Sequence, residues 1–238
     1  AKHSYNWVAF DMDGTLLNHK KQITPATQKA VHNLYSRGFD IVIASGRSLQ
    51  RVLMYADQLP PVFYIVALNG SCIAKFENGK VSILKEFTLQ APVVNALVEM
   101  TQKDKLETGF YVDNDIHVCQ VNKPRAFLEI KGLQLKSIPL ETLKNDTRIT
   151  KIVVLRTYLD DLPIESFTLQ LNALIEQQSQ NKQQHGQSST WYEVYNNSSA
   201  IEINPVGVGK HYGLAYLGKH VLHKQKEHLI AFGDNGND

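Results

Sequence analysis

The chain has 238 residues, 25 Lys and Arg against 23 Asp and Glu, and 43% hydrophobic residues. This length can bury a core without disulfides, and the ordinary composition excludes disordered, collagen-like and coiled-coil proteins. The net charge of +2 gives no electrostatic reason to expect nucleic acid, and no apolar run approaches the roughly 18 residues of a membrane span. Cys72 and Cys119 match no metal-binding spacing, which predicts free thiols and a cytoplasmic location.

Strand and helix patterns alternate along the first 80 residues. The predicted elements are a strand over 7–10, a helix from the N-cap Thr24 to Gly38, a strand over 39–44, a helix near 48–58, a strand near 63–68, and a hairpin bracketed by Asn69-Gly70 and Asn78-Gly79. Alternation of this kind predicts an α/β fold with a parallel sheet, similar to the Rossmann architecture.

The pattern changes after residue 80. Predicted helices over 92–102 and 164–178 are mixed with short strands over 110–112, 116–121 and 151–156. A Gln/Ser-rich stretch over 177–189 follows, and then strands over 191–195 and 200–203, a helix over 208–220 and a strand over 228–232. We therefore expect an α/β core made of residues 1–80 and 186–238, interrupted by an inserted α+β domain over 81–185.

Polar residues that could bind a ligand or take part in catalysis follow four of the predicted strands. They are Asp11 and Asp13 after the first strand, Ser45, Gly46 and Arg47 after the second, Lys210 beyond the strand at 200–203, and Asp234, Asn237 and Asp238 after the last strand. Ligands of open parallel sheets gather outside the carboxyl ends of the strands. We therefore expect these residues to share one crevice.

The residue types in this group indicate phosphate chemistry. Four carboxylates cannot crowd together in ionised form without a cation, and a hard site with few protein oxygens suits Mg²⁺, which recruits phosphate oxygens. Ser45 can donate to a phosphoryl oxygen, Gly46 allows close backbone approach, and Lys210 can balance negative charge. One Asp could attack phosphorus while a second serves as general acid and then as general base.

At these positions the sequence resembles the haloacid dehalogenase superfamily. Its four signatures correspond to Asp11-Met-Asp13-Gly14-Thr15, Ser45-Gly46-Arg47, Lys210 and Gly233-Asp234-x-x-Asn237-Asp238. The resemblance implies that Asp11 is the nucleophile and Asp13 the acid/base. It also implies a Mg²⁺ site formed by Asp234, the Asp11 carboxylate and the Asp13 backbone carbonyl. Ser45, Gly46, Arg47 and Lys210 would hold the phosphoryl group, Asp238 would support the metal or Lys210, and Asn237 would complete the loop.

The place of the insertion resembles the Cof-like phosphatases, which carry a type-two cap domain. The resemblance implies an enzyme that hydrolyses small phosphorylated metabolites, with sugar phosphates as the first guess and neither nucleic acid nor a membrane as partner. A phosphomutase and a non-catalytic phosphometabolite sensor on the same fold stay open as alternatives. Relatives continue beyond the last motif, so we expect further residues after 238.

Two other groups of residues indicate a function less specifically. Tyr111, Asp113, Asp115 and His117 alternate on a predicted hairpin of the insertion and are either solvent-facing residues or contacts that set specificity. The histidines at 211, 220, 223 and 228 have no nearby cysteine, and a solvated surface explains them better than zinc.

Overall fold

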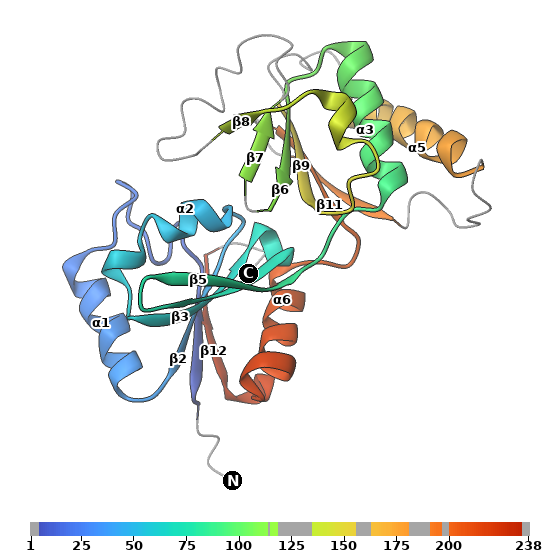
Figure 1. Ribbon diagram of the computed structural model, residues 1–238. Helices are drawn as coiled ribbons and strands as arrows, with labels where there is room; N and C mark the ends of the chain where they lie inside the picture. The colour runs from blue at the N-terminus through green and yellow to red at the C-terminus, as the bar shows by residue number, and fades with distance from the viewer. Residues whose placement is uncertain are drawn as a thin grey trace. The chain divides into compact units, whose positions relative to one another are not determined.

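The computed structural model describes residues 5–113, 115–118, 135–155, 163–180, 191–196 and 200–234. The chain forms two compact units, one of residues 1–87 and 208–238 and the other of residues 88–207. Each unit contains one six-stranded sheet. The two sheets and their helices can be followed in Figure 1, where the first unit holds both ends of the chain.

The sheet of the first unit combines parallel and antiparallel strands. Its strands are β1 (Trp7–Phe10), β2 (Asp40–Ala44), β3 (Val62–Ala67), β4 (Cys72–Glu77), β5 (Lys80–Glu86) and β12 (Leu229–Phe232), in the order β12-β1-β2-β3-β4-β5. The four strands from β12 to β3 are parallel, whereas β4 and β5 add an antiparallel hairpin. The predicted α/β core and its hairpin are confirmed.

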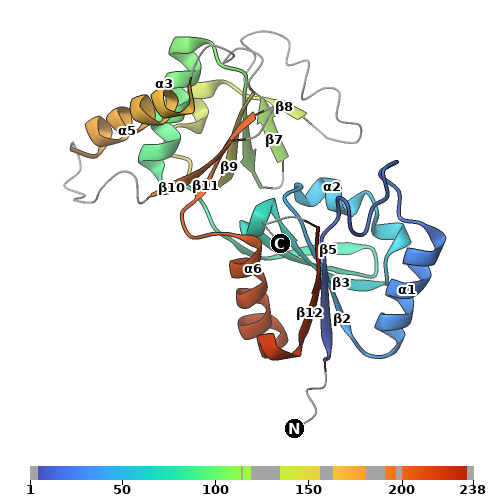
Figure 2. The ribbon, with the colours of Figure 1, turned by 180° about the vertical axis from the view of Figure 1, so that it is seen from behind.

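Helices cover both faces of this sheet. They are α1 (Pro25–Ser36), α2 (Leu49–Leu53) and α6 (Lys210–Leu217), and α1 and α6 lie on opposite sides of β1 and β2 (Figures 1 and 2). Every residue of β1 is buried, as expected for a parallel strand packed on two faces. Thr24 caps α1 by accepting a hydrogen bond from the Thr27 amide, and Pro25 occupies the first turn, as predicted.

The second unit is an antiparallel-rich sheet with two helices on one face. Its strands are β6 (Thr108–Val112), β7 (Asp115–Val118), β8 (Leu135–Ser137), β9 (Ile149–Leu155), β10 (Tyr192–Asn196) and β11 (Ala200–Pro205), in the order β10-β11-β9-β6-β7-β8. The helices α3 (Ala91–Asp104) and α5 (Ile164–Gln180) lie side by side against one face (Figures 1 and 2). Their core includes Phe110, Ile152 and Phe167.

The boundaries between the two units fall at different residues from those predicted. The strand β5 was expected partly in the insertion, but it extends the first sheet by pairing with β4. The strands β10 and β11 were expected in the core, but β11 pairs with β9 and so belongs to the second sheet. Residues 177–180 of the predicted Gln/Ser-rich loop are part of α5, and residues 181–189 lie outside the described residues. Local periodicity locates a strand, but its hydrogen-bonding neighbour decides its sheet.

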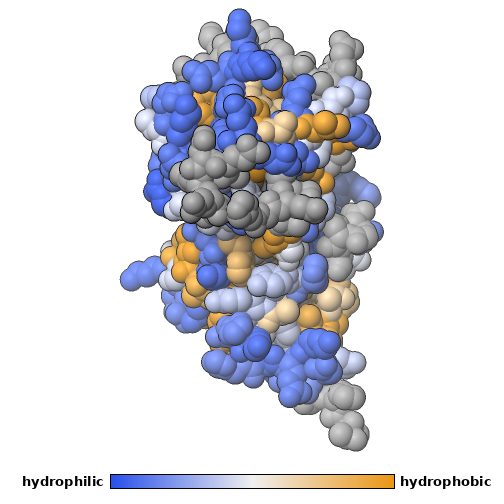
Figure 3. Space-filling model, turned by 90° about the vertical axis from the view of Figure 1, so that its right-hand side faces the viewer, coloured by the Kyte–Doolittle hydropathy of each residue, from blue (hydrophilic) through white to orange (hydrophobic). Residues whose placement is uncertain are grey.

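Within the described residues, no helix is long and apolar enough to cross a membrane. On the side drawn in Figure 3, hydrophobic residues form small patches between hydrophilic ones on the surface of each unit. Scattered exposed apolar residues of this kind are normal on folded proteins and carry no functional meaning by themselves. Cys72 is a free cysteine, as predicted, and the structure buries it, whereas Cys119 lies outside the described residues.

Candidate active site at the carboxyl ends of β1 and β12

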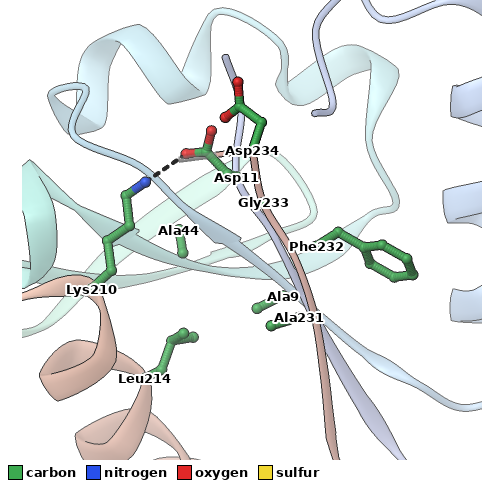
Figure 4. Close-up of a pocket in the computed structure, with 9 residues that line it drawn as sticks. All are labelled: Ala9, Asp11, Ala44, Lys210, Leu214, Ala231, Phe232, Gly233 and Asp234. Carbon is green, nitrogen blue, oxygen red and sulfur yellow. Dashed lines mark hydrogen bonds and ion pairs between the residues drawn. The ribbon is translucent and has the colours of Figure 1, made fainter. Parts of the chain in front are cut away.

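Asp11 and Lys210 form a buried ion pair. Asp11 directly follows β1, and its backbone amide donates to the Phe232 carbonyl of β12 over 2.9 Å. Lys210 is the first residue of α6, and its Nζ lies 2.8 Å from Asp11 Oδ1 (Figure 4). The two side chains are only 6% and 9% exposed. An ammonium partner favours the ionised form of a buried carboxylate, which is the form that a nucleophile requires.

This pair lines a pocket of about 380 Å³. The other lining residues are Ala9, Ala44, Leu214, Ala231, Phe232, Gly233 and Asp234. Figure 4 shows Asp11 and Asp234 close together, with Ala9, Ala44, Ala231 and Leu214 farther along the strands and α6. The acidic groups therefore gather beyond the ends of β1 and β12, where ligands of parallel sheets bind.

Asp234 packs tightly against the turn that follows Asp11. In this turn the Leu16 amide donates to the Asp11 carbonyl and the Leu17 amide to the Met12 carbonyl. Gly14 has a φ of +81°, and a Cβ at this position would overlap Asp234 Oδ2. Glycine is thus required both for the backbone conformation and for the approach of the Asp234 carboxylate.

Asp13 is held by two cations. Arg47 donates from Nε to Oδ2 and from Nη2 to Oδ1, each over 2.7 Å, and Lys21 Nζ donates to Oδ1 over 2.6 Å. The hydrogen bonds from Arg47 hold the pKa of the Asp13 carboxyl well below its usual range, and its side chain is 41% exposed. Asp13 is therefore ionised in this structure, although it was predicted as an acid/base. Lys21 carried no sequence signal that pointed to this contact.

The Ser45-Gly46-Arg47 turn is fixed by neighbouring backbone. The Ser45 amide donates to the Val66 carbonyl of β3, and the Arg47 amide donates to Ser45 Oγ over 3.2 Å. A Cβ on Gly46 would lie 2.9 Å from Asn69 Oδ1. Arg47 pairs with Asp13 in this structure, and its predicted contact with phosphate stays a prediction.

Asn69 is a residue of this region that sequence reasoning missed. Its amide donates to the Ser45 carbonyl, its φ of +55° lies in the left-handed region, and its buried Oδ1 has no hydrogen-bond partner. The only sequence signal was the Asn69-Gly70 pair, which indicated a turn. Its side-chain proximity to Gly46 depends on the pairing of β2 with β3.

The donors near Asp11 fit a hard divalent cation. Among the described residues no group of three or more His, Cys, Asp or Glu side chains could hold a metal ion. Asp11 and Asp234 nevertheless supply two carboxylates at one end of the pocket (Figure 4), and Mg²⁺ is commonly held by one or two carboxylates, with water and substrate phosphate as the other ligands. The Asp13 side chain faces Arg47 and Lys21, which leaves only its backbone carbonyl as the predicted donor. Asn237 and Asp238 lie outside the described residues.

The predicted hairpin residues of the second unit do not share one face. Asp113 pairs with Arg148 and Asp115 with Lys136. His117 lies opposite Phe110, whose side chain is in the helix-covered core, whereas Tyr111 lies opposite Ile116 and packs with the cluster on the other face. The hairpin turn reverses the alternation, because Val112 pairs with Asp115.

Comparisons with known proteins agree with this fold. A family profile described as haloacid dehalogenase-like hydrolase matches residues 8–238. The chain is 23% identical over 232 residues to the 5-amino-6-(5-phospho-D-ribitylamino)uracil phosphatase YcsE of Bacillus subtilis, covering 97% of this chain and 77% of that protein. It is 26% identical over 247 residues to the HMP-PP phosphatase of Yersinia pestis, covering 98% and 79% of the two chains.

A solved structure is also similar over nearly the whole chain. The crystal structure of TM0651 from Thermotoga maritima matches with a TM-score of 0.75 and 21% identity, and it covers 98% of this chain and 81% of that one. At this level of identity the likeness shows the fold.

Proposed function

The chain belongs to the haloacid dehalogenase-like hydrolases, in the Cof-like phosphatase subgroup, and from that premise we propose that it is a magnesium-dependent phosphatase of phosphorylated sugars and similar metabolites. The observation that carries the proposal is the buried Asp11–Lys210 pair beside Asp234 at the ends of β1 and β12. The relatives are phosphatases by name, and one of them is named for a substrate with a phosphorylated ribityl chain.

In the first step, an oxygen of the Asp11 carboxylate attacks phosphorus. A bond forms between Asp11 and phosphorus, the phosphorus–oxygen bond to the leaving group breaks, and the leaving oxygen takes a proton from Asp13. Lys210 keeps Asp11 ionised and balances the negative charge of the phosphoryl group, while Ser45 and the Gly46 backbone contact its oxygens.

In the second step, water attacks the aspartyl phosphate and gives its proton to the Asp13 carboxylate. The bond between Asp11 and phosphorus breaks, and inorganic phosphate leaves. The ionised state of Asp13 in this structure suits this step. In the first step the substrate phosphate competes for Arg47 and Lys21, which weakens their hold on Asp13 and allows it to carry a proton.

Mg²⁺ bound by Asp11, Asp234 and the Asp13 carbonyl would neutralise phosphate charge as a Lewis acid. Supporting roles for Asp238 at the metal or Lys210 and for Asn237 in the loop stay predictions. The inserted domain as a specificity element and the cytoplasmic location also stay predictions.

A phosphate-release screen tests the proposal. The chain is incubated with sugar phosphates, nucleotides and p-nitrophenyl phosphate, after chelation and then with added Mg²⁺, with Asp11→Asn as the control. Release that needs both Mg²⁺ and Asp11 supports the proposal. An isomerised sugar phosphate without released phosphate indicates the mutase alternative, and binding without turnover indicates a sensor.

A further inference from the structure

Tyr55 contacts both of the cations that hold Asp13. Its hydroxyl donates to the Lys21 carbonyl over 3.0 Å, and its ring centroid lies 5.8 Å from Cζ of Arg47. Lys21 precedes α1, Arg47 precedes α2 and Tyr55 follows α2, so separate loop segments of the first unit meet at this tyrosine. None of the sequence motifs includes Tyr55. Its place in this group follows from the structure alone.

The ring of Tyr55 restricts the guanidinium of Arg47. A cation within about 6 Å of an aromatic centroid is attracted to the ring, and the Arg47 side chain is only 9% exposed. The backbone of Arg47 is fixed as well, because the Leu68 amide donates to its carbonyl over 2.9 Å. Since the N–H donors of a guanidinium lie in one plane, its orientation decides where Nε and Nη2 meet the Asp13 oxygens.

The hydroxyl of Tyr55 fixes the backbone of Lys21. Lys21 has a φ of +57°, in the left-handed region that few L residues adopt. Asn18 stabilises this turn, because its Oδ1 accepts from the Lys20 and Gln22 amides over 2.9 and 3.0 Å. The Lys21 side chain is 60% exposed, and an exposed ion pair by itself contributes little. The backbone contacts therefore determine that the Lys21 ammonium lies beside the carboxylate.

Tyr55 is itself anchored. Its amide donates to the Val52 carbonyl near the end of α2, and its own carbonyl accepts from the Gln58 amide. Val52 is buried, and the Tyr55 side chain is partly buried. A residue anchored in this way can keep side chains from different loops in constant positions.

We propose that Tyr55 is a positioning residue for the Asp13 carboxylate. Its ring holds Arg47 and its hydroxyl holds Lys21, so that the two cations fix the direction of both carboxylate oxygens. This inference rests on the proposed function, in which Asp13 transfers a proton to the leaving oxygen and accepts one from water. Proton transfer requires heavy atoms about 2.6–3.2 Å apart, so a small rotation of the carboxylate slows it.

The choice of leaving group tests this role. Phenyl phosphate and p-nitrophenyl phosphate have similar shapes, but the phenol oxygen needs a proton more than the p-nitrophenol oxygen does. The ratio of kcat/KM for phenyl phosphate to that for p-nitrophenyl phosphate therefore reports proton transfer, whereas a loss of folded protein lowers both values equally. We expect this ratio to fall about threefold in Tyr55→Phe, which removes the hydroxyl, and about tenfold in Tyr55→Leu, which also removes the ring. The fall should appear in kcat more than in KM.

Tyr35 supplies the matched controls. It is the penultimate residue of α1, at the opposite end of that helix from Lys21. Tyr35→Phe and Tyr35→Leu remove the same groups as the Tyr55 variants, and they should leave the ratio unchanged. A ratio in Tyr55→Phe equal to that of Tyr35→Phe contradicts a role for the Tyr55 hydroxyl.

Variants of Lys21 show whether the hydroxyl acts through this residue. Lys21→Met should lower the ratio at least as far as Tyr55→Phe does, and Lys21→Arg should keep most of it, because arginine retains a donor to Asp13. Adding Tyr55→Phe to Lys21→Met should cause no further fall. A further fall of about threefold in the double variant contradicts the proposal.

The exchange of the Arg47 Nε–H with water gives a readout that needs no turnover. The hydrogen bond to Asp13 protects this hydrogen, and its signal is observed by ¹⁵N NMR of the full chain and assigned by its loss in Arg47→Lys. We expect exchange at least about threefold faster in Tyr55→Leu than in wild type. Tyr55→Phe, which keeps the ring, and Tyr35→Leu should exchange as wild type does.

These measurements distinguish failure of the positioning role from failure of the proposed function. If wild type hydrolyses no phosphate ester, the proposed function fails, and the Arg47 exchange alone decides whether Tyr55 holds the group around Asp13. Equal exchange in Tyr55→Leu and Tyr35→Leu, or equal losses on both aryl phosphates in the Tyr55 variants, overturns the positioning role even where Asp11 supports hydrolysis.

Discussion

Lys210 Nζ lies 2.8 Å from Asp11 Oδ1, although 199 residues separate the two in the chain. Because both side chains are buried, each charge depends on the other for compensation. The pair therefore links the start of α6 to the end of β1.

This pairing predicts coupled stability effects. Lys210→Met leaves the Asp11 and Asp234 carboxylates without the ammonium and should lower the free energy of unfolding by about 3 kcal/mol. Adding Asp11→Asn to Lys210→Met should restore part of this loss. Urea unfolding in the presence of a chelator measures the free energy of unfolding of Lys210→Met, Asp11→Asn and the double variant. Additive effects in the double variant would show that the two residues do not interact.

Asp11 and Asp13 are predicted to have different chemical roles. Asp13→Asn should reduce turnover on the order of 10²–10⁴-fold, as loss of a general acid/base does. An activated aryl phosphate needs little leaving-group protonation, so it should still phosphorylate Asp13→Asn, and the adduct should then persist. Rapid quench and mass spectrometry locate the adduct. A phosphoryl group on any residue other than Asp11, or one formed in Asp11→Asn, would refute the assignment.

Gly14 and Gly38 offer a matched comparison. Both have positive φ, +81° and +85°, but a Cβ on Gly38 meets nothing within 4 Å, whereas one on Gly14 overlaps Asp234. Gly38→Ala should lower the free energy of unfolding by about 1–2 kcal/mol through backbone strain and leave turnover intact. Gly14→Ala should also displace Asp234 and cost on the order of 10²-fold in turnover. Similar kinetics for the two variants would show that the Gly14 contact is unimportant.

The pKa of His117 predicts a pH dependence of stability. Burial lowers this pKa below the ordinary value of 6.5, although Asp115 and Asp113 partly oppose the shift and Lys136 and Arg148 reinforce it. As the pH falls below about 6.5, the unfolded chain takes up the proton first, so the free energy of unfolding decreases.

His117→Gln should flatten that decrease. Urea unfolding between neutral and mildly acidic pH measures the slope for wild type and the variant. The exposed His19, substituted as His19→Gln, controls for loss of any histidine. An unchanged slope in His117→Gln would mean that this histidine does not couple proton uptake to folding.

The sequence by itself determined most of the elements and the family. Thr24 and Pro25 predict the start of α1, and buried runs such as 7–10 predict strands, because capping and burial act within a few residues. The motifs at residues 11–15 and 45–47 can also be recognised from the sequence, because each consists of consecutive residues in one turn at the end of a strand.

Only the tertiary structure decided which residues meet. The pairing of β11 with β9 moved two predicted core strands into the other unit. Tertiary contacts also bring Arg47 and Lys21 to the Asp13 carboxylate. Asn69 stood out only through its buried, unpaired Oδ1. Strand pairing and side-chain burial depend on contacts between residues far apart in the chain, which local periodicity does not encode.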